Sequence, residues 1–320
     1  MQLDELKKSM KGVVIVNITP FNKDGSLDLE GMRANTRWLL ERTAGKDFIY
    51  NPVGSTGEFS SMSDDECKAV MKMVIEEVNG RHPVFVGAGR AGTQETVKMC
   101  QYAQSVGADG VQVVLPYYLI PQEEGMYQHY QRVAESVNIA VMVYNNPAVS
   151  ASWIRPSLMA RLSRIPNIIA VKENTTDLIS YIRMQKTLDP NEMAIFCGLG
   201  EQMFSYQAVH GCPGFVSSNA NIVPEYAYSV YQAAVARDFK KIDEIISSIA
   251  PFSRFIGRVN KSHGPNTGVT GDVLTLISVV KAAMDIMGLR GGEVRLPLVG
   301  LTDEEKAELR DILKDLKIVS

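Results

Sequence analysis

Eight short apolar runs, rich in β-branched residues, alternate along the chain with segments of helical periodicity. Runs that are apolar on both faces are typical of parallel strands covered by helices. Eight such strands close into a (β/α)8 TIM barrel without an exposed sheet edge, and an open doubly wound sheet is the alternative. The runs are VVIVNITPF (13–21), FIYNPV (48–53), PVFVGAG (83–89), GVQVVLP (110–116), IAVMVYNN (139–146), IIAVKE (168–173), AIFCG (194–198) and GFVSSNA (214–220).

The segments between the runs carry helix signals. Ser63 and Glu66 have the spacing of a capping box, Thr93 can cap the next helical segment, and Gly107 can end it. After about residue 236 the strand signals stop. We therefore predict a catalytic barrel over residues 1–235 and a C-terminal helical appendage over residues 236–320.

One stretch of the appendage, residues 253–272, combines four glycines with several basic residues. Residues 238–259 read as a helix, but we expect the stretch 253–272 as a whole to be a solvated loop. The alternative is that it reaches the site, where Arg254 or Arg258 would contact an acidic substrate.

Composition excludes several classes of function. A net charge of −3 and a pI of about 5.9 indicate neither a nucleic-acid partner nor a membrane surface. The N-terminal stretch is charged and lacks the apolar core of a signal peptide. The four cysteines are widely spaced, which favours reduced thiols, and the four histidines form no metal-binding motif. We expect a cytoplasmic protein without a metal.

Two strand ends carry the residues of most chemical interest. In such barrels the reacting groups lie at the C-terminal ends of strands. Tyr144 lies near this end of the fifth run, and Lys172 lies near this end of the sixth. Burial disfavours the charged form of an amine, and a free amine can attack a carbonyl to give a Schiff base. Tyr144 would then shuttle protons. The alternatives are a solvated lysine and a packing tyrosine.

Polar groups follow three other runs. The second run ends in GSTGE (54–58), whose hydroxyls and backbone N–H groups could hold a carboxylate. The fourth ends in Tyr117 and Tyr118, and the eighth in Ser217, Ser218 and Asn219. Each group alone could be a turn or a surface residue. Together, on neighbouring strand ends, they predict an active site.

A glycine motif offers a rival hypothesis. Residues 87–92, GAGRAG, fit the dinucleotide fingerprint G-x-G-x-x-G between a strand and a helix, as in an NAD-dependent oxidoreductase. That fingerprint requires an acid at the end of the following strand. Here the strand ends in Pro116, and Asp109 precedes it. The dinucleotide hypothesis is therefore disfavoured. A non-catalytic binding module would not need a lysine and a tyrosine at the barrel mouth.

The order and spacing of GSTGE (54–58), YNNP (144–147) and the lysine of AVKE resemble the dihydrodipicolinate synthase / N-acetylneuraminate lyase family of class I aldolases. The likeness extends from the first run to residues 280–298. It implies that Lys172 forms a Schiff base with pyruvate or a longer 2-keto acid, and that no metal or organic cofactor is used.

The resemblance also implies individual roles. Tyr144, Ser55 and Tyr118 would relay protons, and Tyr118 would reach into a neighbouring subunit of a homotetramer, a dimer of dimers. Together with the polar groups at the strand ends, the resemblance gives the residues expected to bind the substrate: Gly54, Thr56, Val216, Ser217 and Asn219.

One departure from the family pattern concerns the second substrate. The synthases resemble Y-N-x-P-x-R, whose arginine binds the carboxylate of aspartate semialdehyde, and Val149 stands at that place here. We therefore expect a sugar-derived 2-keto acid, held by neutral groups such as Asn146, Ser217 and Asn219. The alternatives are dihydrodipicolinate synthase proper and a charge supplied by Arg254 or Arg258. Aldol cleavage, condensation and dehydration all stay open.

Overall fold

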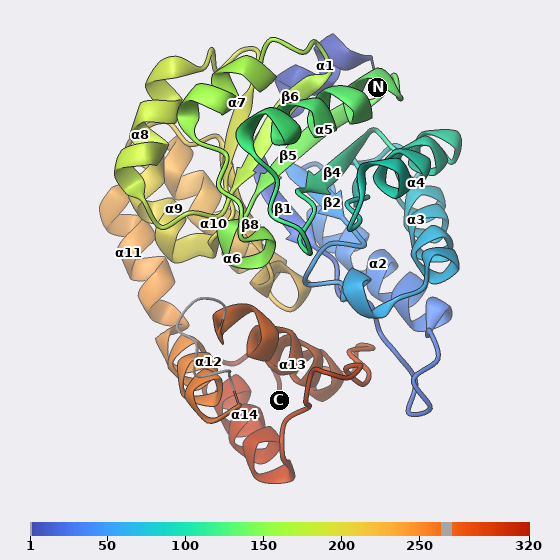
Figure 1. The fold of residues 1–320 in the computed structure, drawn as a ribbon. Coiled ribbons are helices and arrows are strands. Elements are labelled where there is room, and N and C mark those ends of the chain that lie inside the picture. Colours follow the sequence, from blue (N-terminus) through green and yellow to red (C-terminus); the bar gives the residue numbers. More distant parts are fainter. Residues whose placement is uncertain (1, 264–270) are drawn as a thin grey trace.

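The computed structural model describes residues 2–263 and 271–320 and shows eight parallel strands surrounded by helices (Figure 1). The strand order is β2-β1-β8-β7-β6-β5-β4-β3, and a parallel bridge between Tyr50 and Val84 joins the two ends of the sheet. The predicted (β/α)8 barrel is confirmed, and the open sheet is wrong. The strands are β1 Gly12–Val16, β2 Phe48–Asn51, β3 Phe85–Gly87, β4 Gly110–Val114, β5 Ala140–Asn145, β6 Ile168–Glu173, β7 Ala194–Cys197 and β8 Gly214–Ser217.

Helices follow the strands and cover the barrel. The capping box of Ser63 and Glu66 is confirmed. Thr93 is not the cap of its helix but the first helical residue, because Gly92 takes the N-cap position. The helices of this part are α1 Leu3–Ser9, α2 Leu29–Thr43, α3 Asp64–Val78, α4 Thr93–Ser105, α5 Glu123–Glu135, α6 Pro147–Ser150, α7 Pro156–Leu162, α8 Leu178–Thr187, α9 Gly200–Ala208 and α10 Pro224–Val235.

Successive strand residues face opposite sides of the barrel wall. Met142, Ala170 and Val216 belong to a cluster inside the barrel. Val143 and Val171 belong to the larger cluster between the strands and the helices. This alternation decides which side chains of a strand can meet at the barrel axis.

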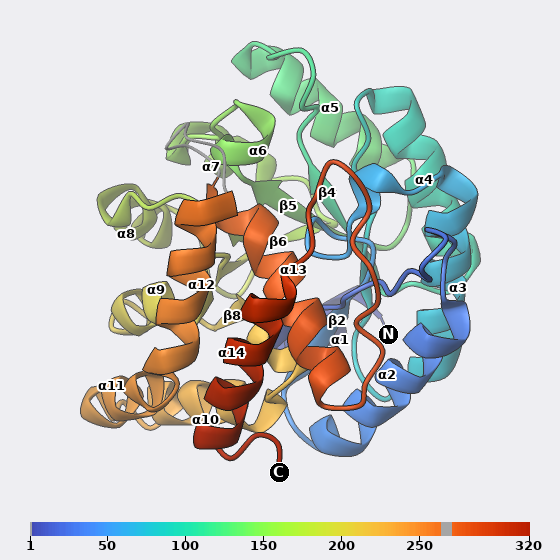
Figure 2. The same ribbon diagram turned by 90° about the horizontal axis from the view of Figure 1, so that it is seen from below.

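The C-terminal helices lie across one end of the barrel (Figures 1 and 2). They form their own apolar cluster, which includes Ile18 and Ile222 from segments that follow β1 and β8. Ile242 of the first C-terminal helix belongs instead to the barrel cluster. The C-terminal helices are α11 Phe239–Ser248, α12 Ala250–His263, α13 Gly271–Ile286 and α14 Asp303–Asp315.

The expectation of a loop at residues 253–272 is wrong for residues 253–263. Residues 253–263 belong to α12, because Phe252, Phe255 and Val259 are buried at a spacing of three and four residues. Residues 264–270 lie outside the described residues.

Other features bear on the expected environment. Among the helices that the structure describes, none combines the length and apolar character that crossing a membrane requires. The four cysteines are buried and free. Within residues 2–263 and 271–320, no group of three or more His, Cys, Asp or Glu side chains is arranged for a metal ion.

Close packing accounts for the GAGRAG glycines. A Cβ atom on Gly87 would overlap the carbonyl oxygen of Val53, and one on Gly89 would lie 2.7 Å from Val114 Cγ1. A side chain at either position would clash with a neighbouring segment of the chain, so both positions require glycine. A closed barrel also lacks the crevice in which doubly wound sheets bind dinucleotides.

We predict that Gly87→Ser destabilises the protein by about 3 kcal/mol or more, because the new side chain overlaps backbone atoms. Gly92→Ser is the matched control within the same motif. No atom lies within 4 Å of its would-be Cβ, and serine is a good N-cap residue. Urea denaturation measures both variants. Equal stability of Gly87→Ser and the wild type would contradict the packing role.

Candidate active site

Parallel register places Tyr144 directly beside Lys172. The two residues pair across β5 and β6, and both side chains face the barrel interior. Lys172 is 3% exposed, Tyr144 is 4% exposed, and Lys172 Nζ lies 4.1 Å from the centre of the tyrosine ring. No carboxylate among the described residues lies within ion-pair distance of Lys172. A buried lysine without a counter-ion is uncommon and marks a functional candidate.

Two further polar groups adjoin this pair. Asn146 Nδ2 donates a hydrogen bond of 2.8 Å to the hydroxyl oxygen of Tyr144. Ser55 and Gly54 line a small pocket together with Tyr144, and Ser55 Oγ is buried without a hydrogen-bond partner among the described residues. The structure thus brings together Lys172, Tyr144 and the Gly54–Ser55 turn, as the sequence predicts.

A buried ion pair holds the end of the GSTGE segment. Glu58 has a left-handed backbone conformation, with φ of 56°. Its carboxylate accepts hydrogen bonds from Lys281 Nζ at 2.5 Å and from the backbone N–H of Arg295 at 3.0 Å. Burial lowers the pKa of Lys281, and the neighbouring Glu58 opposes that shift. Sequence reasoning missed Lys281, because 223 residues separate it from Glu58.

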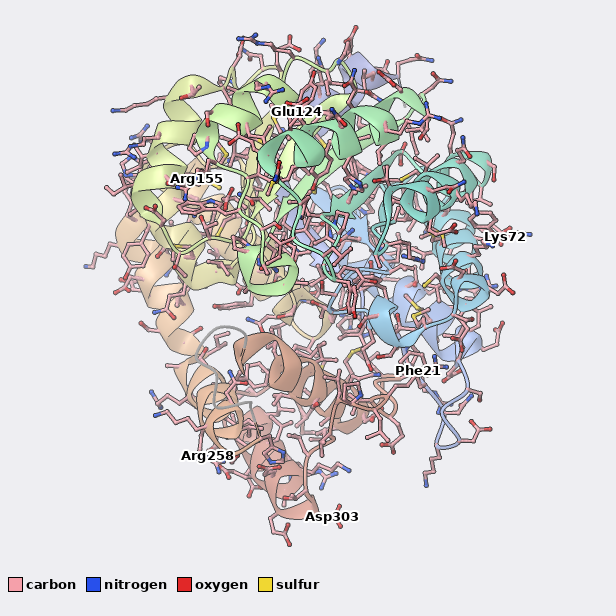
Figure 3. The ribbon with its side chains drawn as sticks, viewed as in Figure 1. Phe21, Lys72, Glu124, Arg155, Arg258 and Asp303 are labelled. Atoms are coloured by element: carbon pink, nitrogen blue, oxygen red, sulfur yellow. The ribbon has the colours of Figure 1, made fainter. Side chains whose placement is uncertain are left out.

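Phe21 marks the place where the C-terminal region meets the barrel (Figure 3). Lys281 Nζ lies 4.5 Å from the centre of its ring, and the guanidinium carbon of Arg295 lies 4.0 Å from it. Arg295 also pairs with Glu66 of α3 at 2.5 Å. The C-terminal region is therefore joined to the GSTGE segment by charged contacts as well as by apolar packing.

The residues at the end of β8 that were predicted to bind the substrate face opposite sides of the barrel wall. Val216 belongs to the interior cluster, but Ser217 Oγ donates a hydrogen bond of 2.6 Å to Glu201 of α9. Asn219 Nδ2 donates to the other oxygen of Glu201 at 3.2 Å. The substrate-binding role of Ser217 and Asn219 stays a prediction, and their bonds to Glu201 favour a structural role.

The remaining predicted residues are more exposed. Thr56 is half-buried in the GSTGE segment, and its substrate-binding role stays a prediction. Tyr118 is 85% exposed in the segment between β4 and α5. An exposed tyrosine at this place is available to a second subunit.

A second, larger cavity lies beside the small one, and we call it the outer pocket. Its volume is about 310 Å³. It is lined mainly by apolar groups, including Phe59, Tyr117, Val149, Ile277, Pro297 and Leu298. Arg258 is not among its lining residues and instead forms an ion pair with Glu308. Arg254 is exposed on α12.

Glu173 follows Lys172 but points to the outside of the barrel wall. Its carboxylate accepts hydrogen bonds from Asn145 Nδ2 at 2.8 Å and from the backbone N–H of Thr175 at 3.1 Å. Burial raises the pKa of Glu173 to about 7, although both hydrogen bonds oppose the shift. Asn145 also bonds both backbone groups of Ile154 at 3.0 Å and so fixes the segment that carries Val149.

A (β/α)8 barrel with a buried lysine and tyrosine on adjacent strand ends is the arrangement of a class I aldolase-type lyase. The chain matches the Dihydrodipicolinate synthetase family over residues 9–316. It belongs to this family.

Similar proteins cover nearly the whole chain. A 4-hydroxy-tetrahydrodipicolinate synthase of Methanocaldococcus jannaschii is 33% identical, over 97% of this chain and 99% of that protein. A dihydrodipicolinate synthase of Acinetobacter baumannii, solved in complex with pyruvate, is 30% identical with a TM-score of 0.84, over 97% and 100% of the two chains. A monomeric dihydrodipicolinate synthase variant is 28% identical with a TM-score of 0.85, over 98% and 99%.

We predict that stability falls as pH rises from about 4.5 to 7, in part because of Glu173. The folded protein keeps the proton of this carboxyl up to about pH 7, whereas the unfolded chain releases it near 4.5. The unfolded chain therefore binds fewer protons in this window, and the free energy of unfolding decreases by about 3 kcal/mol across it. Glu173→Gln should remove this contribution.

Urea denaturation across the window measures the effect in both proteins. Glu244→Gln, at an exposed carboxylate of α11, is the control and should keep the wild-type pH dependence. An unchanged slope in Glu173→Gln would contradict the assignment.

Proposed function

We propose that the protein is a lyase in which Lys172 forms a Schiff base with pyruvate or another 2-keto acid. The observation that carries the proposal is the buried Lys172 amine, which packs on Tyr144 and has no carboxylate partner among the described residues. The solved relative that holds pyruvate supports the choice of substrate.

The geometry suggests how protons move. Lys172 attacks the ketone carbon, the ketone oxygen leaves as water, and the resulting imine draws electrons from the neighbouring carbon. Asn146 Nδ2 donates to the Tyr144 oxygen, so the proton of that hydroxyl is directed to another acceptor. Ser55 Oγ, which lines the same small pocket, is a suitable relay partner. The N–H groups of the Gly54–Thr56 segment would hold the substrate carboxylate.

The comparisons also bear on the second reactant. Relatives named as 4-hydroxy-tetrahydrodipicolinate synthases favour the synthase alternative over a sugar-derived 2-keto acid. The neutral groups expected to hold a sugar are also engaged, since Ser217 and Asn219 bond to Glu201 and Asn146 bonds to Tyr144. We therefore propose condensation of the 2-keto acid with an aldehyde, or the reverse cleavage.

The remaining expectations about context stay predictions. We propose that the reaction needs no metal or organic cofactor, because the lysine imine itself withdraws electrons. We further propose a cytoplasmic location, for which four free, buried cysteines are suited.

We predict that pyruvate plus borohydride modifies Lys172 covalently, because reduction traps the imine. Mass spectrometry of peptides from the treated protein locates the adduct. Tyr144→Phe should keep the fold, since only a hydroxyl is lost, but should slow adduct formation by roughly 10²-fold.

Lys72→Met, at an exposed lysine of α3, is the control lysine variant for this experiment and should still be modified at Lys172. Modification of another lysine in the wild type, or no adduct with any 2-keto acid, would contradict the proposal. A normal rate in Tyr144→Phe would return that residue to a packing role.

We also predict a homotetramer that dissociates when the segment after β4 is altered. Tyr118, Leu119 and Ile120 are three consecutive residues with large, exposed hydrophobic side chains. An exposed apolar patch of this kind is typical of an interface. Ile120→Lys should yield smaller species by light scattering and lower activity. A wild-type monomer with full activity would contradict the prediction, and the monomeric relative shows that such a state exists in the family.

A further inference from the structure

The outer pocket opens beside the residues of the proposed proton relay. Ser55 and Phe59 line both the small pocket next to Tyr144 and the outer pocket. A molecule in the outer pocket would therefore approach the 2-keto acid from the side of Ser55. This is the place where a second reactant fits.

Apolar side chains form opposite walls of the outer pocket. Phe59 and Tyr117 contact each other edge to face, with 6.2 Å between ring centres, and Val149 lies on the same barrel side. Ile277 and Leu298 come from the C-terminal region. Such walls stabilise an apolar group by excluding water. Ser55, Ser60 and Ser61 supply the hydroxyl groups of the lining.

The described residues of the lining offer no cation to an acidic reactant. Glu58 is the charged residue that lines the pocket, and its two oxygens are taken by Lys281 Nζ and the backbone N–H of Arg295. Among the described residues, no lysine, arginine or histidine lines the pocket. Arg258 lies on α12, where it pairs with Glu308 of α14 (Figure 3). A carboxylate in the pocket would lose its hydration without gaining a charged partner.

We propose that the outer pocket selects an aldehyde with an apolar substituent, such as an aryl or branched alkyl group. This inference rests on the proposed function. The Lys172 imine of pyruvate loses a proton from its methyl carbon to give an enamine, and that carbon forms a bond to the aldehyde carbon. The aldehyde oxygen takes up a proton and becomes a hydroxyl. Water then releases the 4-hydroxy-2-oxo acid and the free lysine, and the reverse sequence cleaves the same bond.

Three aldehydes distinguish the substrate classes in the test. Benzaldehyde is the apolar probe, glyceraldehyde the hydroxylated probe and aspartate semialdehyde the charged probe, each supplied with pyruvate to the full-length protein. Product formation is followed by chromatography and mass spectrometry, and kcat/KM is compared. We expect benzaldehyde to be used about tenfold or more better than either polar aldehyde, because these lose hydration in the pocket.

Two substitutions at one position test the role of the pocket wall. Val149→Arg should lower kcat/KM for benzaldehyde by about tenfold and raise that for aspartate semialdehyde, because it introduces a carboxylate partner. Val149→Leu adds volume without charge and should keep the order of the three aldehydes.

The outcomes separate this inference from the proposed function. Borohydride trapping of pyruvate on Lys172, measured in the same samples, reports the first step alone. Trapping together with a preference for a polar aldehyde, or with no condensation at all, would overturn the inference and leave the proposed function standing. Absence of trapping with any 2-keto acid would overturn both.

Discussion

In a closed parallel barrel, each strand residue faces either the axis or the surrounding helices, and the whole site depends on this division. Lys172 and Tyr144 face inward on neighbouring strands, so they meet across one pair of β5–β6 partners. Glu173 is the next residue and faces outward, where it bonds to Asn145. The same short segments thus supply the Lys172–Tyr144 pair inside the wall and a polar network that fixes the adjacent segment outside it.

Charged contacts connect this barrel to the C-terminal region. The Glu58–Lys281 pair lies in the interior, where replacing one partner would leave the other charge without compensation. It links α13 to the segment expected to bind the substrate carboxylate. The C-terminal helices therefore do more than cover the end of the barrel, since they hold one part of its mouth in place.

The sequence was informative where the determinants are local. Apolar runs and helical periodicity predicted the strand ends, and these placed Lys172 and Tyr144 correctly on adjacent strands. The outward direction of Ser217 could also have been inferred, because its neighbour Val216 was assigned to the interior and successive strand residues alternate. The glycines and charges of residues 253–272 suggested a loop, although the spacing of Phe255 and Val259 already favoured a helix in its first part. Lys281 could not be found, because no local pattern connects it to Glu58.

The outer pocket takes one wall from the segments after the strands and the other from the C-terminal region. The proposed imine chemistry would depend on Lys172 and Tyr144, which belong to neither wall. Substitutions at Ile277 or Leu298 would therefore alter the range of partners without disturbing Lys172 and Tyr144. In evolution, duplicated copies of such a gene could diverge in substrate range through their C-terminal helices while each kept a working catalytic centre.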